Sequence, residues 1–206
     1  AAVPVPTWIN VGPIERKDYL GLVLDDNHHD YGFLSSEQVI GKTEARFHRE
    51  GLSTDQLGLL ADRLPCYTSF DLIVLGDTDP ERITPEHRAL LQQYVELGGT
   101  LAISLGENAP RYKGSWLEPL MGVIIGENAF TSEDTLASQA FGRAGVAKRE
   151  GMVTALSPAG ASVHAIGSNF TVGALNTVGN GRVATFTVDA VSGLLHDDPD
   201  FLQVWN

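Results

Sequence analysis

A serine at the end of an apolar run is the first residue in this chain that could do chemistry. The segment Leu101–Asn108, LAISLGEN, passes from apolar residues into Ser-Leu-Gly-Glu, where a strand should give way to a turn. The hydroxyl of Ser104 could attack a substrate there, provided that a base lies within hydrogen-bond reach and a third group orients that base. The alternative is that Ser104 is a small residue at a tight strand end.

Acidic side chains follow the same run and two others. Asp25 and Asp26 come after the first apolar run, Asp77 after the second, and Glu107 after Ser104. Oxygen-rich clusters suit Mg²⁺ or Ca²⁺, and two nearby histidines widen the choice to a transition metal. The competing interpretation is that these acids solvate loops and cap helices. We favour it, because strand ends in α/β proteins often carry Asp without a metal.

Alternating strands and helices are expected to position these side chains. Nearly continuous apolar runs predict buried strands over residues 19–26, 71–77 and 100–106. Helices are predicted over 35–50 and 84–97, and the second begins at Thr-Pro-Glu, a strong helix start. This alternation predicts a parallel sheet, with possible ligands bound beyond the carboxyl ends of its strands.

The second half of the chain changes character. Residues 131–151 are polar and rich in Gly and Ala, and they give no clear pattern. In the first half, residues 52–69 show no single pattern either and could contain a short edge strand. Strands are predicted over 163–166, 170–178 and 182–188. The Gly-Asn-Gly between the last two supplies the positive-φ residues of a tight hairpin, so the sheet should be mixed.

Composition indicates an acidic globular domain. The net charge of −12 disfavours nucleic acid and anionic membrane surfaces as partners, because both would repel the chain. Cys66 is the single cysteine, so neither an intrachain disulfide nor a Cys-based metal site can form. No apolar run reaches the ~18 residues of a membrane helix. We expect an extended lead-in over residues 1–18 and one α/β domain over 19–206, excised from a longer protein.

Four motifs follow one another from residue 67 to the end of the chain. They are FDLIVLGD, TPEHRALLQQYVELGGTLAISLG, a Tyr-Lys-Gly-Ser-Trp-Leu-Glu-Pro-Leu-Met-Gly-Val segment and VGNGRVATFTVDA. The ordered set resembles the class I glutamine amidotransferase-like fold and, more narrowly, the amidotransferase-like domains of large bacterial membrane-anchored proteins. The resemblance implies a flavodoxin-like three-layer α/β sandwich, with a mainly parallel central sheet and an antiparallel hairpin near the C-terminus. It also implies an extracytoplasmic domain of a membrane-anchored protein.

The resemblance also implies where an active site would lie. In true glutamine amidotransferases the strand after this helix ends in Gly-Ile-Cys-x-Gly, and a His-x-Glu follows the last strand. Ser104 falls at the position of the nucleophilic Cys, while Asp189-Ala190-Val191 stands where His-x-Glu would be. The expected base is therefore missing. His196, seven residues after Asp189, is the closest substitute in chain order.

These patterns support three hypotheses about function. The first is a non-catalytic amidotransferase-like domain, without a cofactor, that acts as an interaction or ligand-sensing module and contacts another protein or other domains of its parent chain. The second is a serine hydrolase or amidase that uses Ser104 with a relocated histidine. The third is a module that binds a divalent cation or a phosphate at Asp25, Asp26, Asp77 and Glu107.

Overall fold

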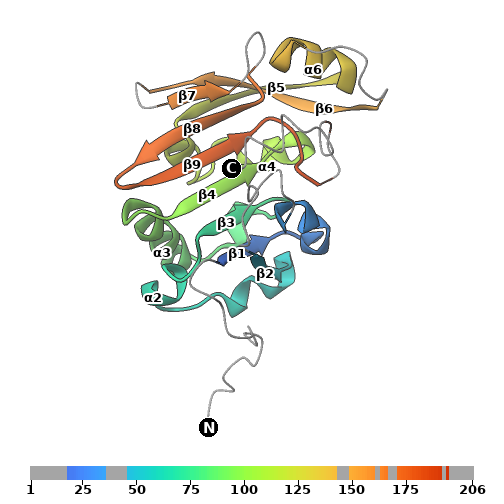
Figure 1. The fold of residues 1–206 in the computed structure, drawn as a ribbon. Helices are drawn as coiled ribbons and strands as arrows, with labels where there is room; N and C mark the ends of the chain where they lie inside the picture. Colours follow the sequence, from blue (N-terminus) through green and yellow to red (C-terminus); the bar gives the residue numbers. More distant parts are fainter. Residues whose placement is uncertain are drawn as a thin grey trace.

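A seven-stranded mixed sheet forms the centre of the protein (Figure 1). The structure is a computed structural model that describes residues 18–35, 46–142, 149–160, 163–166, 171–191 and 194. The sheet has the strand order β2-β1-β3-β4-β9-β8-β7. Its strands are β1 (Tyr19–Leu24), β2 (Phe47–Leu52), β3 (Leu72–Leu75), β4 (Thr100–Ser104), β7 (Val163–Ile166), β8 (Gly173–Val178) and β9 (Gly181–Phe186).

The five strands from β2 to β9 are parallel, and β8 and β7 extend the sheet in antiparallel pairs. In order of appearance the parallel strands follow the 2-1-3-4-5 arrangement of flavodoxin-like folds. The β8–β9 hairpin turns at Gly179, whose φ of +60° suits glycine. The predicted α/β fold, with a mainly parallel sheet and an antiparallel hairpin near the C-terminus, is confirmed.

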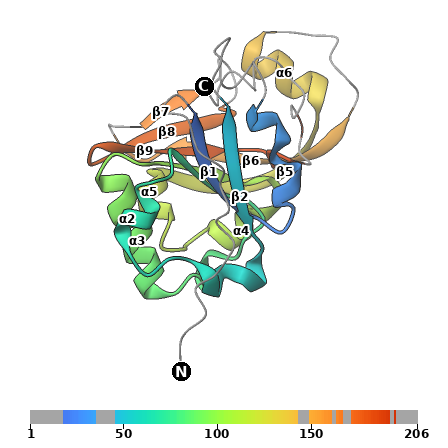
Figure 2. The same cartoon turned by 60° about the horizontal axis from the view of Figure 1, so that its bottom comes forward.

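Helices and short helical turns cover both faces of this sheet. They are α2 (Leu64–Tyr67), α3 (Pro85–Glu96), α4 (Ala109–Tyr112), α5 (Glu118–Met121), α6 (Glu133–Phe141), η1 (His28–Ser35), η2 (Thr54–Leu59), η3 (Pro80–Arg82) and η4 (Gly106–Asn108). Figure 2 shows α2 and α3 side by side, far from α6. None of the helices in the described ranges is long and apolar enough to cross a membrane.

Two apolar cores result, one on each face. Because side chains alternate along a strand, Leu22 and Leu24 pack into the core that contains α3, whereas Val23 packs into the other core. The first core includes Leu91 of α3, and the second includes Leu136 of α6. Burial on both faces explains why the central strands read as continuous apolar runs.

A two-stranded antiparallel ribbon lies beside the main sheet. It consists of β5 (Val123–Ser132) and β6 (Glu150–Pro158), with an irregularity in register between Ile125 and Asn128. Figure 1 shows this ribbon with α6 next to it, above β8 and β9. One link between the ribbon and the rest of the domain is the backbone amide of Thr154, which donates to the carbonyl of Thr187 at 2.9 Å.

Several predicted elements can be compared with this structure. Strands β1, β3 and β4 and helix α3 are confirmed, and the side chain of Thr84 caps α3 as its sequence predicts. The helix predicted over 35–50 is wrong at its end, because Phe47–Leu52 pairs with β1 as a parallel strand. The short edge strand considered within 52–69 is also wrong, since η2 and α2 occupy that region.

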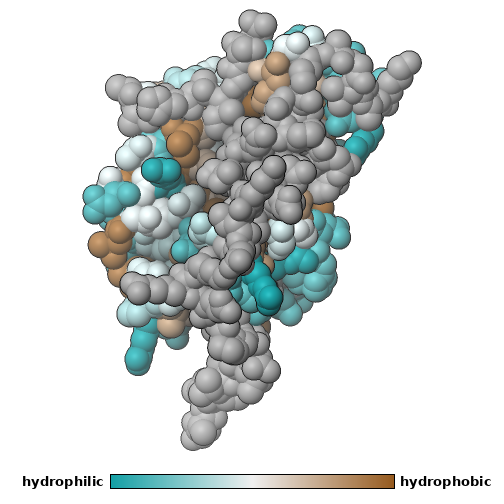
Figure 3. All heavy atoms as spheres, in the orientation of Figure 1, coloured by the Kyte–Doolittle hydropathy of each residue, from teal (hydrophilic) through white to brown (hydrophobic). Residues whose placement is uncertain are grey.

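The predicted lead-in and the middle of the helix predicted over 35–50 lie outside the described residues. On the face drawn in Figure 3, apolar atoms of the described residues form small separate groups among polar ones. The large apolar side chains that are most exposed come from different elements and are Tyr19, Leu59, Leu97, Ile124 and Phe130. This distribution is ordinary for a protein surface.

Candidate functional site

Ser104, the residue at the expected nucleophile position, is buried at the carboxyl end of β4. Only 1% of the surface of Ser104 is exposed to solvent. The hydroxyl donates a hydrogen bond to the carbonyl of Val188 at 3.3 Å and accepts one from the amide of Ala190 at 2.8 Å. Both partners are backbone groups just after β9. The hydroxyl thus ties the end of β4 to that segment and is not presented to a substrate.

In the part of the chain whose side chains are described, no histidine forms a hydrogen bond with this hydroxyl. His28, His48 and His87 each have a hydrogen bond elsewhere, to a backbone carbonyl or to an aspartate. His29, in η1, has its ring centre 4.0 Å from that of His28. The substitute expected from chain order, His196, lies outside the described residues.

Asp189 lies close to Ser104 in the fold, but it serves the local turn. One of its carboxylate oxygens accepts a hydrogen bond from the amide of Val191 at 2.7 Å. A Cβ atom added to Gly106 would lie 2.5 Å from the backbone nitrogen of Asp189, so the turn after β4 and the segment after β9 touch. The φ of +54° at Gly106 also favours glycine. The two segments thus pack directly against each other at Gly106 and Asp189.

The β5–β6 ribbon closes the other side of this turn. The carbonyl of Gly106 accepts hydrogen bonds from the hydroxyl of Thr154 at 3.1 Å and from the amide side chain of Asn128 at 3.3 Å. Thr154 is completely buried. The side-chain oxygen of Asn128 is a second acceptor for the Thr154 hydroxyl, at 3.0 Å. These contacts hold the strand-to-turn segment from the ribbon side, and the sequence did not predict them.

The acid best defined by the structure is Asp25, at the end of β1. It is 3% exposed, and one carboxylate oxygen accepts from the amide of Asn27 at 2.6 Å. The other oxygen accepts from the hydroxyl of Tyr31 and from the amide of Asp77, both at 2.9 Å. Burial raises the pKa of Asp25, while these hydrogen bonds oppose the rise. Asp25 therefore joins the ends of β1 and β3.

The remaining acids of the predicted cation site point to other partners. Asp77 forms an ion pair with Arg111, and Asp26 accepts a hydrogen bond from the amide of Thr54 at 2.6 Å. Glu107 is exposed. The structure thus brings Asp25 and Asp77 together but uses their carboxylates separately. Across the described ranges, no group of three or more His, Cys, Asp or Glu residues is placed to hold a metal ion.

Two buried tyrosines complete this region, and sequence reasoning missed both. Tyr31 donates to Asp25, and Tyr112 donates to the carbonyl of Gly76 at 2.7 Å. Burial raises the pKa of both phenols, and the nearby Asp25 carboxylate adds to the rise. A Cβ atom on Gly76 would lie 1.7 Å from an oxygen of Asp25. The sequence signal for this packing was Gly76 directly after a buried strand, because a glycine there often marks a place where another group approaches the backbone closely.

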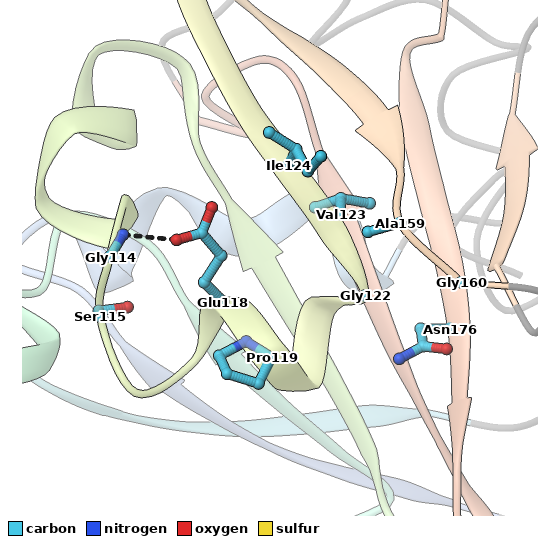
Figure 4. Close-up of a pocket in the computed structure, with 10 residues that line it drawn as sticks. All are labelled: Gly114, Ser115, Glu118, Pro119, Gly122, Val123, Ile124, Ala159, Gly160 and Asn176. Carbon is cyan, nitrogen blue, oxygen red and sulfur yellow. Dashed lines mark hydrogen bonds between the residues drawn. The ribbon is translucent and has the colours of Figure 1, made fainter.

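A surface pocket of about 550 Å³ lies elsewhere, beside α5 (Figure 4). The loop before α5, α5 itself, the start of β5, the chain after β6 and Asn176 of β8 line it. Asn176 pairs with Val183, whereas Ser104 pairs with Phe186, three residues further along β9. At about 3.3 Å per residue, Asn176 and Ser104 are offset by about 10 Å in the direction of the strands.

Known proteins match this chain in structure but not in sequence. No family model matches it, and no curated protein matches it significantly. A cytoplasmic protein of Salmonella typhimurium LT2 superposes with a TM-score of 0.63 at 14% identity, over 89% of this chain and 93% of its own. A second cytoplasmic protein, of Salmonella typhimurium, gives a TM-score of 0.64 at 12% identity, over 91% and 96%.

Part of a larger enzyme is similar as well. A β-galactosidase from Bacillus circulans sp. alkalophilus superposes with a TM-score of 0.52 at 13% identity. The match covers 91% of this chain but 30% of the β-galactosidase. At these identities the likeness concerns the fold alone. The chain therefore has an α/β fold that is similar to two nearly whole Salmonella proteins and to about a third of a glycosidase.

Proposed function

We propose that this chain is a non-catalytic amidotransferase-like domain that acts as an interaction or ligand-sensing module of a larger bacterial protein. The observation that carries the proposal is the burial of the Ser104 hydroxyl between two backbone partners. A nucleophile must reach its substrate and pass its proton to a base. A hydroxyl that is 1% exposed and bonded to Val188 and Ala190 meets neither requirement.

The ribbon contacts support the same proposal. Thr154 and Asn128 bind the carbonyl of Gly106, two residues after Ser104. An acyl-transfer site needs room at this turn for a substrate carbonyl and for amide groups directed at its oxygen. Here the turn lies between β6 and the segment at Asp189. This packing around Gly106 supports a domain that has the α/β scaffold but does not use Ser104 as a nucleophile.

The test is a search for hydrolytic activity that depends on Ser104. We expect wild-type protein to release no ammonia from glutamine and to resist labelling by a fluorophosphonate probe. Activity or labelling that disappears in Ser104→Ala, but persists in the exposed control Ser157→Ala, would overturn the proposal. The control keeps the number of serines equal while leaving the buried hydroxyl in place.

The two other hypotheses make different demands. A serine hydrolase needs a histidine such as His196 within hydrogen-bond reach of Ser104. The fluorophosphonate labelling described above also tests this hypothesis. A divalent cation at Asp25, Asp26, Asp77 and Glu107 should raise the melting temperature, because it binds only the folded state. The ion pair of Asp77 with Arg111 argues against it, since the cation would have to displace a fixed charge.

The expected partner is another protein or another domain of the parent chain. The acidic composition argues against nucleic acid and against direct membrane contact by this chain. An extracytoplasmic location is supported only by the sequence resemblance. The likeness to two Salmonella proteins described as cytoplasmic does not support it.

A further inference from the structure

The pocket beside α5 has the size of a small-molecule site. Its volume of about 550 Å³ falls in the usual range of roughly 300–1,000 Å³ for ligand pockets. Figure 4 shows Glu118 and Asn176 on opposite sides of it. The amide side chain of Asn176 donates to the carbonyl of Leu120 at 2.8 Å, which ties the β8 wall to α5. The walls are therefore held by contacts within the protein.

Glu118 gives this pocket its charge. It is the one charged side chain among the described lining residues. One carboxylate oxygen accepts from the amide of Gly114 at 2.6 Å, and the other accepts from the amide of Ile125 at 3.4 Å. These amides orient the carboxylate but carry no net charge, so its negative charge is kept. A carboxylate has about four acceptor sites, and two are used here.

Apolar groups lie next to this carboxylate. Ile124 lines the pocket and is 60% exposed, and the ring of Pro119 is exposed as well. A ligand with a hydrocarbon part would remove these side chains from water, which is favourable. The protein as a whole has a net charge of −12, which attracts cations and repels anions. The pocket thus combines a fixed negative charge with an apolar wall.

We propose that this pocket binds a small alkyl-ammonium ligand, with Glu118 as the counter-ion and with Ile124 and Pro119 against the hydrocarbon part. A half-buried carboxylate forms a charge-assisted hydrogen bond with an ammonium donor, which is stronger than a bond between neutral groups. The proposal rests on the ligand-sensing role proposed above. Its test does not involve Ser104, so a failure of either idea is recognised separately.

The experiment is a titration of the full chain with n-butylammonium near neutral pH, followed by amide chemical shifts. We expect saturable shifts at Gly114 and Gly160, which line the pocket, and much weaker shifts with the neutral probe n-butanol. Glu118→Gln should weaken binding about tenfold, because it removes the charge but keeps an acceptor oxygen. Glu127→Gln, an exposed site on β5 outside the pocket, should leave binding unchanged.

A second variant covers the possibility that Glu118→Gln disturbs the loop at Gly114. Ile124→Ser changes an exposed residue and should weaken n-butylammonium binding by reducing the apolar wall. The proposal is overturned if no saturable shift occurs at the pocket, if n-butanol binds as well as n-butylammonium, or if Glu127→Gln weakens binding as much as Glu118→Gln. Glutaminase activity that depends on Ser104 would overturn the proposed function instead.

Discussion

The hydroxyl of Ser104 and the backbone amide of Ala190 form a buried hydrogen bond of 2.8 Å. The two residues are 86 positions apart in the chain. The bond joins the end of a central parallel strand to the segment after the last strand of the parallel sheet. A serine hydroxyl can act as a nucleophile in enzymes, but at this position it makes a structural contact.

Removing that contact should lower stability. Ser104→Ala removes the hydroxyl that accepts a hydrogen bond from the buried amide of Ala190, so we expect the free energy of unfolding to fall by about 1–3 kcal/mol. Urea denaturation measures this change. The exposed control Ser157→Ala should cost less than about 0.5 kcal/mol. Equal losses in the two variants would contradict the role assigned to Ser104.

Asp25 should make stability depend on pH. Burial raises its pKa above the ordinary value of 3.8, so between that value and the higher folded one the folded state keeps a proton that the unfolded state has released. The contribution of Asp25 to the free energy of unfolding therefore falls as pH rises through this interval, and is constant above it.

Asp25→Asn does not titrate and should remove this contribution. It also replaces one of the two acceptor oxygens by an NH2 group, which then faces the backbone N–H of either Asn27 or Asp77, so we expect a loss of about 1–3 kcal/mol at neutral pH. Denaturation curves at several pH values should show a wild-type advantage that shrinks as pH rises from about 4. Asp30→Asn, at an exposed site, is the control. A constant difference between wild type and Asp25→Asn would contradict the prediction.

Gly76→Ala should be among the most damaging small substitutions in the chain. The added methyl group would lie 1.7 Å from an oxygen of Asp25 and 2.4 Å from the hydroxyl of Tyr31, in a buried region. We expect a loss of about 3 kcal/mol, measured by thermal or urea unfolding. Gly58→Ala introduces the same group where nothing lies within 4 Å, and should be nearly neutral. Similar effects of the two would argue against the close packing of β1 and β3.

Thr154→Val tests whether the ribbon holds the turn after β4. Valine keeps the shape of threonine but cannot donate to the carbonyl of Gly106, so about 1–2 kcal/mol should be lost. Hydrogen exchange at Leu105 and Gly106 should also become faster, since the turn opens more easily. Thr177→Val, exposed on β8, serves as the matched control. Unchanged exchange in Thr154→Val would contradict the prediction.

The central strands and helix α3 could be predicted because the residues that determine them lie within each element. Strands β1, β3 and β4 are buried on both faces, which produces continuous apolar runs. Helix α3 begins with a capping Thr84 and a proline, both readable locally. The strand β2 was missed because its six residues, FHREGL, are mostly half-buried and their pairing with β1 overrides local preference.

The ribbon and most of the candidate site could not be predicted. Strand β5 has an irregular register and mixed exposure, so neither a period of two nor a helical period appears. Helix α6 did leave a signal, since Ser132 caps it and acids fill its first turn. The position of Ser104 followed from the motif. Its partners did not, because they are backbone atoms of a distant segment.

The pairing of Thr100 with Arg182 has a consequence for how the chain is made. Strand β4 reaches its parallel neighbour β9 only after the ribbon, α6 and β8 have been synthesised. Until then the N–H and C=O groups on this edge of β4 are unpaired, and open strand edges promote association with other chains. A shortened product that ends before residue 181 should therefore aggregate during expression.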